Sequence, residues 1–196
     1  ERLHITVTYA YIDLILRAPF YITFLAISFS FVIITDRIQF TKQSKHSIIL
    51  RVVYMSINKI TEHLFSLQDL SYKEFNSKLI PTVNKNYVIG VRIPLLRKYA
   101  KEIKNSPEAD KFLNSLPHKY TEEYNLHALL LENIKSYDDV VKALDEFLPF
   151  VDNWATCDIM SIKIFKKHLD ILPQQLDLWL HSTHTYTIRF AIKMYM

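Results

Sequence analysis

Glycine and cysteine are almost absent from this chain of 196 residues, which contains one of each, Gly90 and Cys157. Tight turns between strands commonly rely on glycine, so a fold built from many short strands is disfavoured and helices joined by short loops are favoured. A lone cysteine cannot form an intramolecular disulfide, which is typical of a reducing compartment. No group of Cys and His residues has the spacing of a zinc site, so we expect no metal.

A strong excess of positive charge is also missing from most of the chain. The formal net charge is +4, but residues 1–54 hold six Lys and Arg against three Asp and Glu, which leaves 18 against 17 in residues 55–196. Net charge therefore gives little support to nucleic-acid binding, and only a clustering of basic side chains on one surface would provide it. The hydrophobic content of 49% is typical of a globular protein.

Residues 1–54 differ from the remainder, because they include an uncharged apolar run at 18–35 that is long enough to span a membrane. One interpretation is a membrane anchor, whose following basic residues would leave the rest of the chain on the cytoplasmic side. A signal peptide fits less well, since no small-residue cleavage site follows. We favour a third interpretation, in which residues 1–54 are not native protein, because Met55 resembles a normal start and helical periodicity begins directly after it.

From residue 56 onward, apolar residues recur at helical spacing. Ser and Thr residues stand where helices would begin, and prolines stand at first turns or just beyond helix ends. A short strand at 87–89 would have no evident partner. The chain ends inside a helical pattern without a stop signal, so we expect the helices to continue. The predicted helices cover 56–65, 71–79, 94–103, 108–116, 121–134, 136–148, 154–169, 174–181 and 185 to the end.

Two polar features of this helical region are ordinary when taken alone. Trp154 and Asp158 are four residues apart, so they share one face of the predicted helix 154–169. Asp158 lies near the predicted start of that helix, where the dipole stabilises a carboxylate. A core aromatic beside a solvated or capping charge is the commoner arrangement of such a pair. Arg189, which shares a helix face with Tyr186 and Lys193, is likewise most often a surface cation.

Three segments together resemble the DNA alkylation repair (AlkD-like) glycosylase family. They are residues 78–82 with 89–101, residues 150–158, and residues 184–192. They carry Gly-Val-Arg-x-Pro from Gly90, Trp-x-x-x-Asp from Trp154 and Arg-Phe-Ala from Arg189. The resemblance covers residues 56–196 and none of 1–54. It implies that 55–196 is one all-α domain, an α-solenoid or superhelix of HEAT-like antiparallel helix pairs, apparently truncated at the C-terminus.

The resemblance also implies a function, excision of cationic N3- or N7-alkylated purines from duplex DNA by hydrolysis of the N-glycosidic bond. Trp154, Asp158 and Arg189 match the family's catalytic positions, with the ring against the damaged nucleotide, the carboxylate near the deoxyribose and the guanidinium on a phosphate. A fixed carboxylate stabilises the positive charge that develops on the sugar. We expect the protein to need no metal or cofactor and to be a monomer. We also expect it to lie in the cytoplasm, associated with the nucleoid. Family members that bind branched or bent DNA without catalysis provide the alternative function.

Other basic residues are candidates for contacts with DNA phosphates. Some form a stripe at helical spacing along the predicted helix 94–103, and others cluster at 163–167. The alternative for each group is a solvated helix face. Cys157 is expected to be a small buried residue and not a nucleophile, since no activating histidine is its neighbour in sequence. The expected DNA contacts are Arg97, Lys101, Lys163, Lys167 and Lys193.

Overall fold

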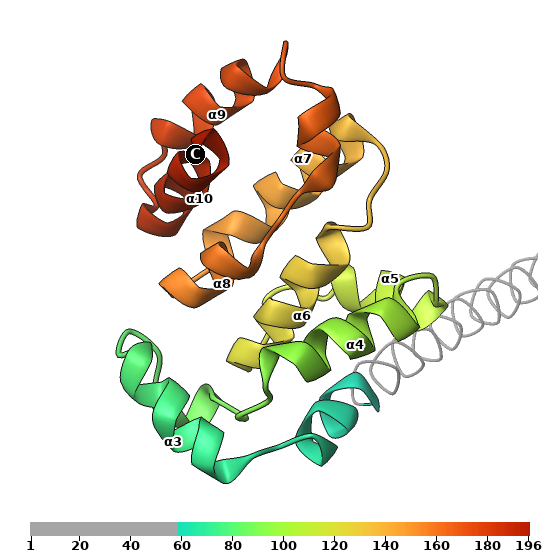
Figure 1. Cartoon of the computed structure of the whole chain (residues 1–196), viewed down its shortest axis with the longest axis vertical. Coiled ribbons are helices and arrows are strands. Elements are labelled where there is room, and N and C mark those ends of the chain that lie inside the picture. The colour runs from blue at the N-terminus through green and yellow to red at the C-terminus, as the bar shows by residue number, and fades with distance from the viewer. Residues whose placement is uncertain (1–58) are drawn as a thin grey trace, which may run out of the picture. The chain divides into compact units, whose positions relative to one another are not determined.

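The computed structural model describes residues 59–196, in which every regular element is a helix (Figure 1). The interpretations of residues 1–54, the boundary at Met55 and the helix start at Ser56 lie outside the described residues. No helix within 59–196 has the length and apolar character needed to cross a bilayer. After a helical stretch at 59–66, the elements are α3 (Leu70–Leu79), η1 (Lys85–Tyr87), α4 (Ile93–Ile103), α5 (Pro107–Leu113), α6 (Thr121–Leu131), α7 (Tyr137–Phe147), η2 (Leu148–Phe150), α8 (Trp154–Ile159), η3 (Lys163–Lys167), α9 (Leu172–Leu180) and α10 (Thr185–Tyr195).

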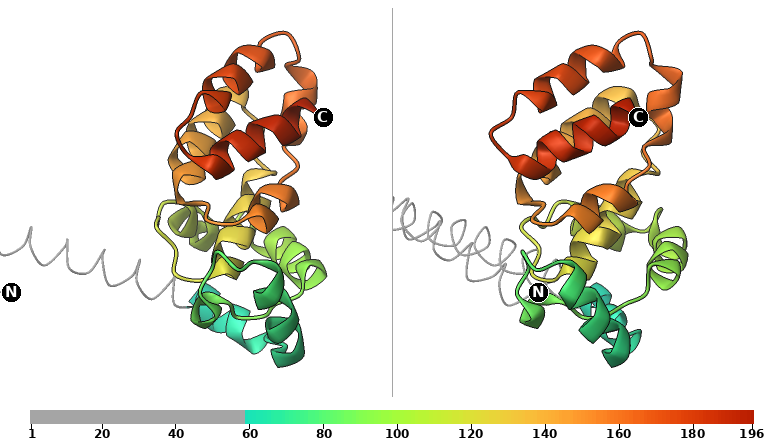
Figure 2. Two further views of the ribbon diagram at one scale, coloured as in Figure 1. Left: turned by 90° about the vertical axis from the view of Figure 1, so that its left-hand side faces the viewer. Right: turned by 60° about the vertical axis from the view of Figure 1, so that its left-hand side comes forward.

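The helices pack side by side in the manner of an α-solenoid of HEAT-like antiparallel pairs, as the sequence predicted (Figures 1 and 2). α9 and α10 form an antiparallel pair joined by the short turn at 181–184, and α10 also packs against α8. α8 in turn lies against α6, which contacts α4, α5 and α7. This order places α8 between the central helix α6 and the last helix α10.

Every residue of α6 is buried, whereas an amphipathic helix buries only one face. The buried set includes charged and polar side chains, which generally need hydrogen-bond partners because they are removed from water. The Thr121 hydroxyl is the exception, since it has no partner among the described residues. Glu123 accepts the backbone N–H groups of Lys119 and Tyr120, each at 2.9 Å. His127 shares a hydrogen bond of 2.8 Å with His118. These satisfied polar groups allow α6 to serve as the core of the described unit.

Glu122 of α6 fixes the loop that contains the single glycine. Its carboxylate accepts the N–H groups of Ile89 at 2.8 Å, Gly90 at 2.7 Å and Val91 at 3.4 Å. Gly90 adopts a φ of 98°, and a Cβ added there would lie 2.6 Å from the Cβ of Lys73. Only glycine fits this backbone without strain. The Gly-Val-Arg-x-Pro segment is therefore structural, because it attaches the α3–α4 connection to the central helix.

Several local predictions need correction. α3 begins one residue before the predicted cap, because Asp69, and not Ser71, accepts the N–H of Tyr72 at 3.0 Å. The Ser71 hydroxyl donates to the same carboxylate instead. Phe65, whose place in the apolar pattern of the predicted helix 56–65 implied an inward side chain, is 42% exposed and packs edge-on against the Tyr120 ring. Residues 87–89 form the end of a 3-10 turn and an extended connection, with no strand anywhere in 59–196.

Candidate active site

The candidate site is built on α8, a helix of six residues whose start is fixed by Asn153. The fully buried Asn153 side chain accepts the N–H of Thr156 at 2.9 Å, the usual role of an N-cap asparagine. The Thr156 hydroxyl donates to the Asn125 side-chain oxygen of α6 at 2.8 Å. This network joins α8 to the central helix. This network was not predicted from the sequence, although an asparagine directly before Trp154 is a recognisable cap.

The end of α8 lies at Ile159, ten residues before the predicted end of the helix. Neither Pro nor Gly stops it, and Met160 simply turns into extended backbone with ψ 133°. The last carbonyl groups are instead bonded by cations from other helices. Lys193 of α10 donates to the carbonyls of Asp158 and Met160, both at 2.6 Å, and Arg97 of α4 donates to that of Ile159 at 3.1 Å. Asp158 therefore lies in the last turn, where the helix dipole does not stabilise a carboxylate.

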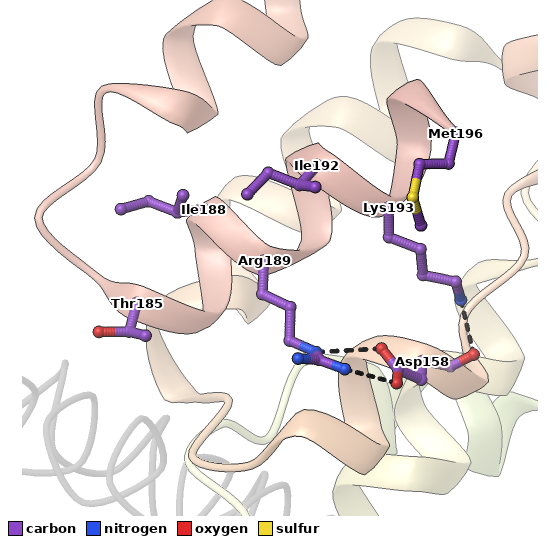
Figure 3. Close-up of a pocket in the computed structure, with 7 residues that line it drawn as sticks. All are labelled: Asp158, Thr185, Ile188, Arg189, Ile192, Lys193 and Met196. Carbon is purple, nitrogen blue, oxygen red and sulfur yellow. Dashed lines mark hydrogen bonds and ion pairs between the residues drawn. The ribbon is translucent and has the colours of Figure 1, made fainter.

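Arg189 supplies the positive charge that the helix dipole does not. Its Nε donates to Oδ1 of Asp158 at 3.1 Å and its Nη2 to Oδ2 at 2.8 Å, so that the two side chains face each other across α8 and α10 (Figure 3). The hydrogen bonds to Asp158 raise the pKa of Arg189 above its usual value, so the guanidinium stays charged. Both side chains remain reachable from solvent, with 46% of Arg189 and 38% of Asp158 exposed.

Trp154 lies beside this pair and is only partly covered. Its indole N–H donates to the carbonyl of Leu79 at the end of α3, at 2.9 Å, and 38% of the residue is exposed. The guanidinium carbon of Arg189 is 6.0 Å from the centre of the indole ring. The ring is therefore tethered at its nitrogen while part of its surface stays open. The structure thus brings together all three residues that the resemblance marked as catalytic.

A pocket of about 610 Å³ opens beside the Asp158–Arg189 pair (Figure 3). Its volume lies within the range of pockets that bind small organic groups. Asp158 and Arg189 stand at one side of the pocket, and apolar side chains of α10 form much of the remainder. A group held in this pocket would lie against the carboxylate. The lining consists of Asp158, Thr185, Ile188, Arg189, Ile192, Lys193 and Met196.

The remaining basic residues fall into two groups. Arg97 and Lys193 reach the end of α8, as described above, and burial lowers the pKa of Lys193 below its usual value. Lys101 on α4 and Lys163 and Lys167 on η3 are exposed, and they form no ion pair within residues 59–196. They make no hydrogen bond to the residues of the candidate site. A DNA contact by these three lysines remains a prediction.

Glu132, which directly follows α6, is a further residue that contacts the segment after α8, and it was not among the predicted site residues. One carboxylate oxygen accepts the N–H of Ser161 at 2.9 Å, and the other lies 3.5 Å from Nη1 of Arg97. Glu132 lies far from both partners in sequence, so no local pattern marks it. Its carboxylate joins the connection after α8 to the arginine of α4.

Cys157 lies between Trp154 and Asp158 in sequence but points into the protein. Its side chain is fully buried, with the sulfur 3.4 Å from the carbonyl oxygen of Tyr186. Burial raises the pKa of the thiol to about 12. Because the thiolate is the nucleophilic form, a thiol with this pKa is inert, as the sequence analysis expected. In residues 59–196, His, Cys, Asp and Glu side chains nowhere gather in groups of three or more that could hold a metal ion.

Comparison with known proteins supports the resemblance carried by the three motif segments. A family model described as DNA alkylation repair enzyme matches residues 60–196, which include every residue of the candidate site. Neither a search of curated proteins nor a search of solved structures returned a significant match. The family match spans well over half of the chain. The protein therefore belongs to the DNA alkylation repair enzyme family, a family of DNA repair proteins.

Proposed function

We propose that the protein is a DNA glycosylase that releases cationic N3- or N7-alkylated purines from duplex DNA. The observation that carries the proposal is the exposed Asp158 carboxylate, held by Arg189 at the edge of a pocket in a member of a DNA repair family. A charged, solvent-accessible carboxylate beside a pocket suits a reaction in which positive charge develops on the substrate.

The chemical step needs little from the protein beyond electrostatics. The bond between C1′ and the purine nitrogen breaks with its electron pair moving to the base, so a cationic alkylated purine leaves as a neutral molecule. The deoxyribose becomes an oxocarbenium ion, which Asp158 stabilises through its negative charge. A water oxygen then bonds to C1′, and its proton passes to the carboxylate or to solvent. No general acid is required, because the leaving base already carries the compensating charge.

Arg189 can bind a phosphate without releasing Asp158. Its bonds to the carboxylate use Nε and one N–H of Nη2, and it makes no other hydrogen bond within residues 59–196. An arginine carries more donors than these, in a planar fork that suits phosphate oxygens. The Nη1 group and the second N–H of Nη2 are therefore left to donate to a phosphate of the DNA strand. In this arrangement Arg189 sets the distance between the carboxylate and the DNA backbone.

Trp154 and the exposed lysines complete the proposed DNA contact. The open part of the tethered indole would lie against the damaged nucleotide, where its face attracts a cationic base and excludes water. Lys101, Lys163 and Lys167 would extend the contact along the backbone of double-stranded DNA, bound by one copy of the protein. These lysines would raise affinity without reading sequence.

The experiment uses duplex DNA carrying 7-methylguanine or 3-methyladenine, with unmethylated duplex as the control. We expect release of the free methylated base, detected by chromatography, and we expect it to persist in a metal chelator. The alternative function, non-catalytic binding of branched or bent DNA, predicts tighter binding to a four-way junction than to methylated duplex. Binding to methylated duplex without base release would reject the glycosylase.

A further inference from the structure

The end of α8 is held in an unusual way, because two cations from distant parts of the chain bind its last carbonyl groups. Lys193 comes from α10 and Arg97 from α4, on either side of α8 in the packing order. Positive charge at a helix C-terminus is favourable, since the unpaired carbonyls there carry partial negative charge. These carbonyls belong to the turn that contains Asp158.

The ammonium group of Lys193 is fully engaged in this contact. It donates to the carbonyl of Asp158 at 2.6 Å, to that of Met160 at 2.6 Å and to that of Cys157 at 3.3 Å (Figure 3 shows the first). These three acceptors match the donors of an ammonium group one for one. Binding a phosphate would require Lys193 to abandon three carbonyls at the helix end.

Arg97 holds the same helix end from the other side. Its Nη2 donates to the carbonyl of Ile159 at 3.1 Å, while its Nη1 lies 3.5 Å from the Glu132 carboxylate. Glu132 also accepts the N–H of Ser161, which lies just beyond the helix. Arg97 and Glu132 therefore fix the backbone that leaves α8, and Lys193 fixes the backbone of Asp158 itself.

We propose that Lys193 and Arg97 are positioning residues, which hold the last turn of α8 so that the Asp158 carboxylate meets the deoxyribose at a fixed distance. The proposal rests on the glycosylase function proposed above, and it assigns these cations to the protein backbone and not to DNA phosphates. A helix of six residues is too short to be stable alone, so its geometry depends on its caps. Asn153 caps the start, and these cations cap the end.

The first arm of the test measures DNA affinity against salt concentration, for which no catalysis is needed. Lys193→Met should leave the slope of log K against log salt unchanged. Lys101→Met is the matched control, an exposed lysine proposed to contact phosphate, and it should reduce the magnitude of the slope by about one unit. A reduction of about one unit for Lys193→Met would overturn the proposal, because it would show a phosphate contact.

The second arm measures the rate of base release at saturating enzyme in a single turnover. Lys193→Met should slow release by about ten- to hundred-fold with Kd nearly unchanged, as expected when a reacting group is displaced by about an ångström. Lys193→Arg, which keeps the charge and the donors, should restore most of the rate. Arg97→Met should act in the same direction as Lys193→Met. A Lys193→Met rate equal to wild type would contradict the positioning role.

Failure of the proposed function is distinguishable from failure of this inference. If the wild-type protein releases no base, hydrogen exchange at the backbone amides of 154–161 replaces the rate measurement. Exchange there should accelerate in Lys193→Met and stay at the wild-type rate in Lys101→Met. If Lys193→Met is too unstable to compare, Lys193→Gln, which keeps part of the donor set, serves in its place. Unchanged exchange in the Lys193 variant would overturn the inference whatever the protein catalyses.

Discussion

Asp158 and Arg189 face each other through two hydrogen bonds, of 3.1 and 2.8 Å, between α8 and α10. Both side chains are substantially exposed, and ion pairs of this kind contribute between nothing and about 1 kcal/mol to stability. Stability therefore does not explain the arrangement. The pair keeps a charged carboxylate and unused guanidinium donors next to each other at the mouth of a pocket, which is the geometry that the proposed reaction needs.

Replacing Arg189 with alanine should separate folding from DNA binding. We expect the free energy of unfolding to change by less than about 1 kcal/mol, because the pair is exposed. The slope of log K for DNA binding against log salt concentration should fall in magnitude by about one unit, because one phosphate contact is lost. Chemical denaturation and salt-dependent affinity measurements test the two expectations. Lys142→Ala, which removes an exposed charge from α7, is the control and should leave the slope unchanged. Equal slopes for Arg189→Ala and wild type would remove Arg189 from the phosphate contact.

Much of the fold could be predicted from sequence because the relevant signals are local. Pro94 stands in the first turn of α4, and Ser136 accepts the N–H of Asp139 to cap α7, both as expected. The helical periodicity and the near-absence of glycine pointed to an all-α fold, and the resemblance to the family implied a solenoid; the structure confirms both. Trp154 and Asp158 also share a helix, as their spacing predicted, although α8 ends ten residues before the predicted end at 169.

The features that sequence reasoning missed depend on contacts between distant residues. α8 stops where Arg97 and Lys193 bind its carbonyls, and nothing in the local sequence marks that end. Glu122 is buried because the loop at 89–91 needs an acceptor, although an Asp or Glu near a helix start is usually solvated. The orientation of Lys193 could not be predicted either. A lysine on an amphipathic helix can extend into solvent, bind a phosphate or donate to backbone carbonyl groups, and the sequence does not distinguish these.

The buried His118–His127 pair should make the protein sensitive to mild acid. Burial lowers the pKa of His118 to about 4 and that of His127 to about 2, so both rings are neutral in the folded protein. The histidines of the unfolded chain take up protons near pH 6.5, whereas the buried rings do not. The free energy of unfolding is therefore highest above that pH and falls as the pH drops toward 4. We expect a loss on the order of 3 kcal/mol for each ring between pH 7 and pH 4, measured by urea denaturation.

Two variants isolate this histidine contribution from other acid effects. His127→Phe should lower stability at pH 7, because the hydrogen bond to His118 is lost, but should flatten the loss between pH 7 and pH 4. His181→Gln removes an exposed ring and should keep the wild-type pH dependence. If His127→Phe and wild type lose the same free energy over this range, the buried pair does not set the acid response.

Glu122→Gln tests the attachment of the glycine loop to α6. The amide is close in shape to the carboxylate, but its NH₂ group cannot accept the backbone N–H groups that surround it. We expect a loss of roughly 2–3 kcal/mol, because a charged acceptor is replaced and a buried donor is left unpaired. Glu74→Gln, at an exposed position on α3, is the matched control and should cost little. Near-equal denaturation midpoints for the two variants would count against this role of Glu122.

Residues 1–54 are expected to be dispensable, a prediction that rests on sequence alone. A form beginning at Met55 should fold, and it should bind DNA with the affinity of the longer chain, because the amphipathic pattern and the family match lie beyond residue 55. Thermal unfolding and DNA affinity of the two forms provide the comparison. A large drop in midpoint for the shorter form would place the segment in the core. Partition of the longer form with membranes would support the anchor interpretation.

The most direct measurement of the central claim is single-turnover base release by Asp158→Asn. The amide keeps the size of the side chain and one acceptor for Arg189 but removes the negative charge that stabilises the oxocarbenium ion. With duplex DNA containing 7-methylguanine at saturating enzyme, we expect release at least about a hundred-fold slower than wild type, with Kd changed less than about threefold. Wild-type rates from Asp158→Asn would contradict the account.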